Sequence, residues 1–293
     1  MEKEHTKVMV FPELCITGYT CQDLFLQRRL LDSAWETLMR IAADTADVDA
    51  LIFLGVPVRN KGKLYNAAAV LNRGEILGLV PKSYLPNYGE FYEQRHFVSG
   101  LGCLEFMSIN GKKIPFGTNL LFVCEELQEL IVAAEICEDL WVNMPPSVFH
   151  AQAGANLIVN LSASNEMVGK DSYRRSLVSG QSARLVCGYV YANAGEGEST
   201  QDLVFGGQNM IAENGSILAE GERFKNGIVY SEIDVQRLND ERKRLTTWQS
   251  CEDSDHLRIP FHLKMEETKL TRQYSRYPFV PSQKSERDLR CDE

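Results

Sequence analysis

Residues 31–56, LDSAWETLMRIAADTADVDALIFLGV, place a helical pattern directly before a buried-strand pattern. Apolar residues recur there at the spacing of one helix face: Leu31, Ala34, Trp35, Leu38, Ile41 and Ala42. This spacing predicts an amphipathic helix with one buried stripe. The continuous apolar run at 51–56 is typical of a strand covered on both faces. Short apolar runs and helical patterns alternate along the rest of the chain, which indicates an α/β fold.

Further elements follow from the same patterns. We expect strands at 8–11, 130–136, 156–161 and 188–192, and helices at 171–187 and 235–245. Two hairpins are predicted, one joining 65–71 to 75–80 and one joining 208–212 to 216–219 around Asn214 and Gly215. Periodicity fades after Thr246, so we divide the chain into a domain at 1–264 and a linker or tail at 265–293.

Composition excludes several classes of protein. An apolar fraction of 44% can build a large core, and a formal net charge of −9 disfavours a nucleic-acid binder. No run approaches the ~18 apolar residues of a membrane helix. The eight cysteines form no CxxC pair or Cys/His cluster, so we expect free thiols in a reducing cytoplasm and no metal site.

Three segments carry groups that could perform chemistry. Glu13 lies in FPELCITGY at 11–19, Lys82 in PKSYLPNYGEF at 81–91, and Cys137 in AEICEDLW at 134–141. Each follows a predicted strand, and ligands gather at strand ends in α/β sheets. Taken singly, each also has a plain explanation: a cysteine as a small core residue, a glutamate as a helix cap, a lysine in water.

The three segments in this order resemble the Glu-Lys-Cys signature of the nitrilase, or carbon-nitrogen hydrolase, superfamily. FPELCITGYTCQDLF, PKSYLPNYGEFYEQRHF, EICEDLW and NLSASN are similar to the N-terminal glutaminase domain of glutamine-dependent NAD synthetases. The resemblance implies a four-layer α-β-β-α sandwich. It also implies that the chain lacks the first strand and helix of the family, because only seven residues precede Val8.

The resemblance assigns roles to the three groups. The Cys137 thiolate would attack the side-chain amide of glutamine, and Glu13 would move the proton. Lys82 and the backbone N–H of Glu138 would stabilise the oxyanion. A further carboxylate that orients the lysine would be Glu90, with Glu93 as the alternative.

Four residues would bind the glutamine substrate by the same resemblance: Tyr88, Glu138, Ser164 and Lys170. Some relatives carry arginine where this chain has Lys170, and the two cations are not equivalent at a carboxylate. The alternative for Ser164 and Lys170 is helix N-capping and a solvated charge.

The resemblance also implies partners. Ammonia would pass to an ATP-dependent synthetase domain that binds ATP, Mg and deamido-NAD. We expect that the glutaminase domain itself binds none of these cofactors. A homo-oligomer is expected, without nucleic acid or membrane. The alternatives are a stand-alone nitrilase-type amidase or N-carbamoyl amidase, and an inert truncated relative.

Overall fold

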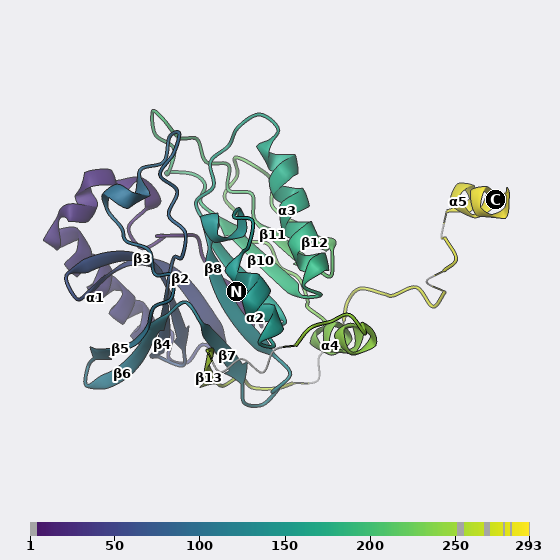
Figure 1. Ribbon diagram of the computed structural model, residues 1–293, viewed down its shortest axis with the longest axis horizontal. Helices are drawn as coiled ribbons and strands as arrows, with labels where there is room; N and C mark the ends of the chain where they lie inside the picture. Colours follow the sequence, from purple (N-terminus) through teal and green to yellow (C-terminus); the bar gives the residue numbers. More distant parts are fainter. Residues whose placement is uncertain (1–4, 251–254, 267–269, 278, 282, 293) are drawn as a thin grey trace.

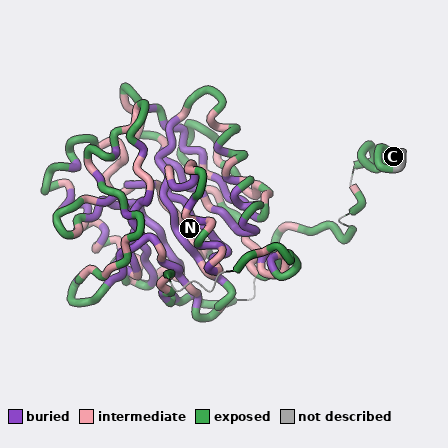
Figure 2. The backbone as a smooth tube through the Cα atoms, in the orientation of Figure 1, coloured by how far each residue is buried: buried purple, intermediate pink, exposed green. Residues whose placement is uncertain are grey.

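Two mixed β-sheets face each other at the centre of the molecule, and helices lie on their outer faces (Figure 1). The computed structural model describes residues 5–250, 255–266, 270–277, 279–281 and 283–292. Figure 2 shows the buried residues concentrated along the strands.

The first sheet has six strands in the order β1-β2-β3-β4-β6-β5. They are β1 Val8–Val10, β2 Leu51–Asn60, β3 Lys63–Asn72, β4 Glu75–Pro81, β6 Lys112–Gly117 and β5 Leu104–Ile109. β1 runs parallel to β2, and β2, β3 and β4 form antiparallel pairs. The predicted hairpin between β3 and β4 is confirmed.

The second sheet has seven strands in the order β12-β11-β10-β9-β8-β7-β13. They are β12 Ser216–Glu220, β11 Met210–Glu213, β10 Gly188–Asn193, β9 Leu157–Ser162, β8 Ile131–Ile136, β7 Leu120–Cys124 and β13 Leu257–Phe261. β8, β9 and β10 are parallel, so their carboxyl ends meet at one edge. The predicted hairpin of β11 and β12 is confirmed, with positive φ at both Asn214 and Gly215, as a primed turn requires.

Three hydrophobic clusters define four layers. The cluster between the sheets includes Phe53 and Phe122, whose rings meet edge to face at 5.9 Å. A second cluster packs helix α1, Arg28–Asp44, on the outer face of the first sheet. A third packs α2, Pro146–Gln152, and α3, Lys170–Arg184, on the second sheet. The α-β-β-α sandwich and the predicted helices at α1 and α3 are therefore confirmed.

The end of the chain differs in part from the expected tail. Helix α4, Val235–Arg244, matches its prediction, but β13 adds a strand to the second sheet and α5, Lys284–Asp292, adds a helix. Within the predicted tail, Arg272 Nη2 lies 2.6 Å from both carboxylate oxygens of the buried Glu213. α5 lies apart from the body of the molecule (Figure 1). The division at residues 264 and 265 stays a prediction.

The described cysteines are free thiols: Cys15, Cys21, Cys103, Cys124, Cys137 and Cys187. Cys251 and the side chain of Cys291 lie outside the described residues. Within the described part of the chain, no group of three or more His, Cys, Asp or Glu side chains could hold a metal ion. In the same residues, every helix is too short or too polar to cross a bilayer.

Candidate active site

Glu13 lies in a tight turn that follows β1. Its side chain is 1% exposed, and its backbone N–H donates to the carbonyl of Ser162 at 3.4 Å, at the end of β9. Gly55 on β2 allows this turn to approach, because a Cβ there would lie 2.1 Å from the backbone nitrogen of Leu14. The turn therefore crosses from one sheet to the other and carries the carboxylate between them.

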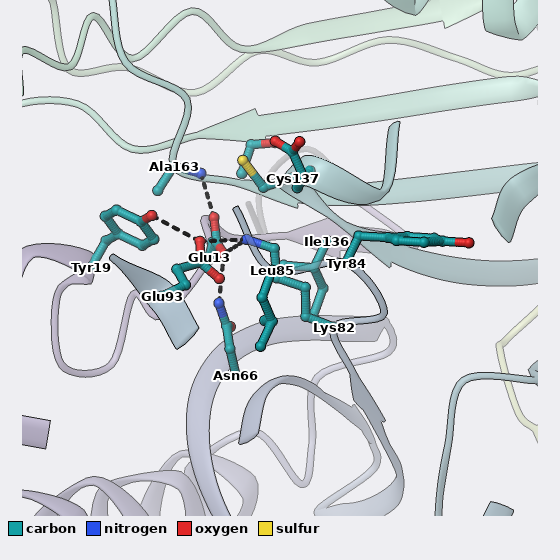
Figure 3. A network of polar contacts seen from close by, with 12 residues as sticks. Glu13, Tyr19, Asn66, Lys82, Tyr84, Leu85, Glu93, Ile136, Cys137 and Ala163 are labelled. Atoms are coloured by element: carbon teal, nitrogen blue, oxygen red, sulfur yellow. Dashed lines mark hydrogen bonds and ion pairs between the residues drawn. The ribbon is translucent and has the colours of Figure 1, made fainter. Parts of the chain in front are cut away.

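Three donors surround the Glu13 carboxylate (Figure 3). Oε1 accepts from Asn66 Nδ2 and Lys82 Nζ, each at 2.6 Å, and Oε2 accepts from the backbone N–H of Ala163 at 2.9 Å. The donors come from β3, the end of β4 and the end of β9, so strands of both sheets hold the single carboxylate of Glu13. Such pairing is required of a buried charge.

Lys82 follows β4 directly and is 1% exposed. Besides Glu13, its ammonium contacts Glu93 Oε1 at 2.7 Å. Burial opposes the charge of Lys82, but the carboxylates of Glu13 and Glu93 outweigh it and hold the lysine pKa well above its ordinary value. The lysine therefore presents a fixed positive charge to the site.

Cys137 begins a short 3-10 helix, η4 Cys137–Leu140, at the end of β8. Its φ of +43° is a left-handed conformation that β-carbon-bearing residues rarely adopt, and its backbone N–H donates to Asn160 Oδ1 at 3.1 Å. Figure 3 shows the sulfur on the side that faces Ala163 and Glu13. The structure thus brings the three predicted groups, Glu13, Lys82 and Cys137, into one cluster.

The cluster disfavours a resting thiolate. Burial raises the pKa of Cys137, and the Glu13 carboxylate raises it further, whereas Lys82 lowers it. The residue is 7% exposed. Because the thiol stays protonated, a nucleophile forms here only if a neighbouring base removes the proton during reaction.

Asp139 ties the cysteine turn to the lysine segment. Its Oδ1 accepts from the backbone N–H groups of Ser83 at 3.1 Å and Tyr84 at 2.8 Å, and its Oδ2 accepts from that of Ile136 at 2.9 Å. The side chain is 2% exposed. One buried carboxylate therefore fixes the positions of both segments relative to each other.

The assignment of Glu90 as the carboxylate beside Lys82 is wrong, and the alternative, Glu93, occupies that place. Glu93 begins the 3-10 helix η3, Glu93–Arg95. Its backbone N–H donates to the carbonyl of Pro86, and this hydrogen bond folds the loop back over the site. Tyr19 donates to Glu93 Oε1 at 2.8 Å. Burial raises the pKa of Glu93 to about 7, against the lowering effect of Lys82. Glu90 instead accepts from Asn165 Nδ2 at 2.5 Å.

The residues expected to bind substrate make hydrogen bonds to each other or to neighbouring side chains. Tyr88 donates to Glu138 Oε1 at 2.7 Å, and Lys170 donates to Asn165 Oδ1. The Lys170 ammonium lies 5.1 Å from the ring centre of Trp141 and 5.8 Å from that of Phe91. Burial lowers the pKa of Lys170, and Arg174 nearby lowers it further, so this is not a solvated lysine.

Ser164 is not a helix cap. The residue before α3 is Gly169, and no side chain caps that helix. Ser164 is 2% exposed, and its hydroxyl accepts from Arg174 Nη2 at 3.3 Å. Helix capping is therefore excluded as the role of Ser164, and solvation as that of Lys170.

Comparisons with known proteins identify the family of the chain. The carbon-nitrogen hydrolase profile matches residues 1–243. The chain belongs to the carbon-nitrogen hydrolase family. Among curated relatives of this carbon-nitrogen hydrolase, the glutamine-dependent NAD(+) synthetase of Mycobacterium tuberculosis is 43% identical over 283 residues, covering 93% of this chain and 42% of the relative. The synthetase of Aquifex aeolicus is 33% identical over 245 residues, covering 83% and 39%. The chain spans about two fifths of the length of these relatives.

Solved structures resemble this carbon-nitrogen hydrolase as well. A glutamine-dependent NAD(+) synthetase from Cytophaga hutchinsonii superposes with a TM-score of 0.67 at 34% identity, over 75% of this chain and 35% of that one. A carbon-nitrogen hydrolase from Helicobacter pylori gives a TM-score of 0.65 at 20% identity, over 83% of both chains, which shows the shared fold.

Several residues of the site were not predicted from the sequence. Asn66 and Asn160 are buried amides within apolar strands, in YNAAAV and LIVNLS. A polar residue in such a strand is a usable signal, because a buried amide requires partners. Tyr19, Asp139 and the Ala163 N–H act through distant contacts that no local pattern marks.

Proposed function

We propose that this domain hydrolyses the side-chain amide of glutamine to glutamate and ammonia through a thioester on Cys137. The observation that carries the proposal is the buried contact of Glu13 with Lys82 beneath the Cys137 sulfur. An amide is unreactive toward water, and this cluster supplies a nucleophile, a base and a fixed cation in one place. Relatives named glutamine-dependent NAD(+) synthetases supply the substrate class.

The first half of the reaction uses each group once. Glu13 takes the thiol proton as the Cys137 sulfur attacks the amide carbon. Lys82, joined by the backbone N–H of Glu138, stabilises the oxyanion of the tetrahedral intermediate. Glu13 then passes its proton to the amide nitrogen, and ammonia leaves a thioester on Cys137.

The second half reverses these roles with water. Glu13 removes a proton from a water molecule that attacks the thioester, and the proton returns to the sulfur as glutamate departs. Glu93 holds the Lys82 ammonium together with Glu13 throughout, since both carboxylates contact it.

The polar end of glutamine would bind at the outer residues. Lys170 would pair with the α-carboxylate, which Ser164 would also contact, while Glu138 and Tyr88 would hold the α-ammonium. In the described structure Tyr88 and Glu138 bond to each other, and Lys170 bonds to Asn165. Substrate would therefore replace existing contacts. We further propose that ammonia feeds an ATP-dependent synthetase domain, which converts deamido-NAD to NAD and binds ATP and Mg, within a homo-oligomer.

Covalent labelling tests the nucleophile and the specificity together. Treatment with diazo-oxo-norleucine, followed by intact-mass measurement and peptide mapping, should place one adduct on Cys137. Cys137→Ala should abolish the adduct and glutamate release. Cys187→Ala removes another buried thiol outside the cluster and should preserve both.

Two outcomes would contradict the proposal. Absence of an adduct on folded protein would favour an inert relative. Hydrolysis of N-carbamoyl amino acids without turnover of glutamine would instead indicate an N-carbamoyl amidase with the same catalytic cluster.

A further inference from the structure

Glu135 is a buried acid that the proposed reaction does not use. It lies on β8, two residues before Cys137, and is 1% exposed. Among the described residues, none of the ion pairs involves it. Its carboxylate accepts instead from the hydroxyl of Tyr189 and, at 2.9 Å, from the backbone N–H of Ser147. A buried acid with neutral partners requires a reason for its place.

The hydrogen bonds of Glu135 continue to the nucleophile. Asn160 Nδ2 donates to the Tyr189 hydroxyl at 3.1 Å, and Asn160 Oδ1 accepts from the backbone N–H of Cys137 at 3.1 Å. Ser162 Oγ also donates to Asn160 Oδ1, at 2.6 Å. In each of the hydrogen bonds that join Cys137 to Glu135, the donor lies on the side of Cys137 and the acceptor on the side of Glu135. The Glu135 carboxylate therefore sets the orientation of the Asn160 side-chain amide. The three side chains come from β8, β9 and β10, which lie side by side.

We propose that Glu135, Tyr189 and Asn160 form a positioning relay that holds the Cys137 backbone in the left-handed conformation from which its sulfur faces Glu13. The proposal rests on the proposed function, because it concerns the orientation of that nucleophile. The φ of +43° at Cys137 is strained for a residue with a side chain, and such strain persists only where the surroundings impose it. The hydrogen bond from the Cys137 N–H to Asn160 is the direct restraint.

The relay also determines which backbone N–H group is free to donate a hydrogen bond to the oxyanion. The Cys137 N–H points to Asn160 and is satisfied there. Oxyanion stabilisation therefore falls to Lys82 and to the N–H of the following residue, Glu138. Without the relay, the turn can relax, and the sulfur moves relative to both Glu13 and Lys82.

Tyr189→Phe tests the relay by removing one oxygen atom. We expect kcat for glutamine to fall on the order of tenfold while KM stays within about twofold, because the loss concerns alignment and not binding. The second measurement is the pH dependence of Cys137 alkylation by iodoacetamide, followed by peptide mapping. Its midpoint should shift by about half a unit or more, because the distances from the sulfur to Glu13 and Lys82 set the thiol pKa.

Tyr65→Phe is the matched control. Tyr65 is a buried tyrosine of the other sheet, 6% exposed against 0% for Tyr189, and its hydroxyl makes no hydrogen bond with the described residues. This variant should leave kcat and the alkylation midpoint unchanged. If Tyr189→Phe does not fold, Glu135→Gln replaces it, since glutamine keeps the volume and should shift both quantities in the same way.

The possible results separate the relay from the proposed function. An unchanged alkylation midpoint in the folded variant would overturn the relay, as would a rise in KM at constant kcat. If the wild-type chain hydrolyses no glutamine, the proposed function fails, but the alkylation measurement still decides whether the relay positions Cys137.

Discussion

At the centre of the site, the Glu13 carboxylate disfavours ionisation of the Cys137 thiol. Burial and the negative charge of Glu13 both raise the pKa of Cys137, whereas the Lys82 ammonium and the backbone of Ala163 lower it. In the proposed reaction, the same carboxylate is the base that removes the thiol proton. Glu13 therefore destabilises the thiolate at rest, and in the proposed reaction it would also generate that thiolate by accepting the proton.

Glu13→Gln should separate these two effects. Loss of the base is expected to reduce glutamine hydrolysis by roughly 10²–10⁴-fold. The alkylation midpoint of Cys137 should nevertheless move to lower pH, because a negative neighbour is gone while Lys82 remains. Steady-state kinetics and iodoacetamide labelling across pH measure both. Glu125→Gln, at an exposed position, is the control, and a midpoint that moves upward would contradict the argument.

Glu93→Gln and Glu90→Gln should change different kinetic constants. Glu93 contacts Lys82 at 2.7 Å, so its replacement should lower kcat by about tenfold or more. Glu90 contacts Asn165, which also accepts from Lys170, so its replacement should raise KM and change kcat little. Parallel measurement of kcat and KM decides. Equal loss of kcat in the two variants would argue against the distinct places of these acids.

Glu93 should also make stability depend on pH. Burial raises its pKa from 4.5 to about 7, so the folded protein binds more protons than the unfolded chain between these values. Its contribution to stability is present below pH 4.5 and is lost as pH rises through about 7. Urea unfolding across this window should show a steeper decline for wild type than for Glu93→Gln. If stability fell equally with pH in the wild type and in Glu93→Gln, Glu93 would not be the group responsible for the pH dependence.

At the residue scale, the sequence identified Glu13, Lys82 and Cys137 because their neighbours form recognisable motifs. It did not distinguish Glu90 from Glu93, because both follow Lys82 in one irregular loop. The difference arises from the hydrogen bond between the Glu93 N–H and the Pro86 carbonyl, which determines the side of the loop that faces the lysine. A bond of this kind depends on the loop conformation and leaves no periodic signal.

The element that most directly positions the base is β2. Gly55 lies in its interior, where the turn that carries Glu13 approaches so closely that no side chain fits. Ile16 donates its N–H to the Gly55 carbonyl at 3.2 Å, which continues the contact. This strand therefore determines where the acid lies.

Gly55→Ala should displace the Glu13 turn. A Cβ at this position would lie 2.1 Å from the Leu14 nitrogen and 2.5 Å from the Pro12 carbonyl, so the backbone must shift. We expect a loss of stability of about 1–3 kcal/mol and a fall of roughly a hundredfold in kcat. Urea unfolding and glutamine turnover measure these. Gly180→Ala, in α3 with open space around it, should preserve both, and an unaffected kcat in Gly55→Ala would contradict the argument.

Most of the continuous patterns were predicted as elements, whereas the strands β5, β6, β7 and β13 were not predicted. β2, β3, α1 and α3 carry continuous patterns, and the structure confirms them. β6 and β13 contain Pro115 and Pro260, which weaken a strand signal. Each of these two strands pairs with a strand distant in sequence, β13 with β7 and β6 with β4, and β6 also forms a hairpin with β5. Such pairings supply stability that local propensity does not reveal.

At the scale of the whole molecule, the segment after β13 is attached to the body over part of its length. Arg272 pairs with the buried Glu213 at the end of β11, and Arg237 of α4 lies 4.1 Å from the ring centre of Tyr274. A tail that begins at residue 265 therefore includes residues that stabilise the second sheet. The boundary predicted from the loss of periodicity did not take these contacts into account, because they join residues far apart in sequence.

Two truncations test this attachment. Ending the chain after Lys264 removes Arg272 and should lower stability by about 1–3 kcal/mol, because a hydrogen-bonded acid loses a charged partner. Ending it after Tyr277 should change stability by less than about 0.5 kcal/mol. Urea midpoints compare the two, and Arg272→Ala should reproduce the first result. Equal stability of both shortened chains would show that the contacts contribute nothing.

The protonated, buried state of Cys137 has a consequence for survival under oxidative stress. Peroxides oxidise thiolates and accessible sulfurs, whereas burial raises the pKa of Cys137 and the residue is only 7% exposed. An idle enzyme would consequently retain its nucleophile through a burst of oxidant. Damage would accumulate during turnover, when the proton moves to Glu13 in the proposed reaction, so that the rate of oxidation would rise with the rate of catalysis.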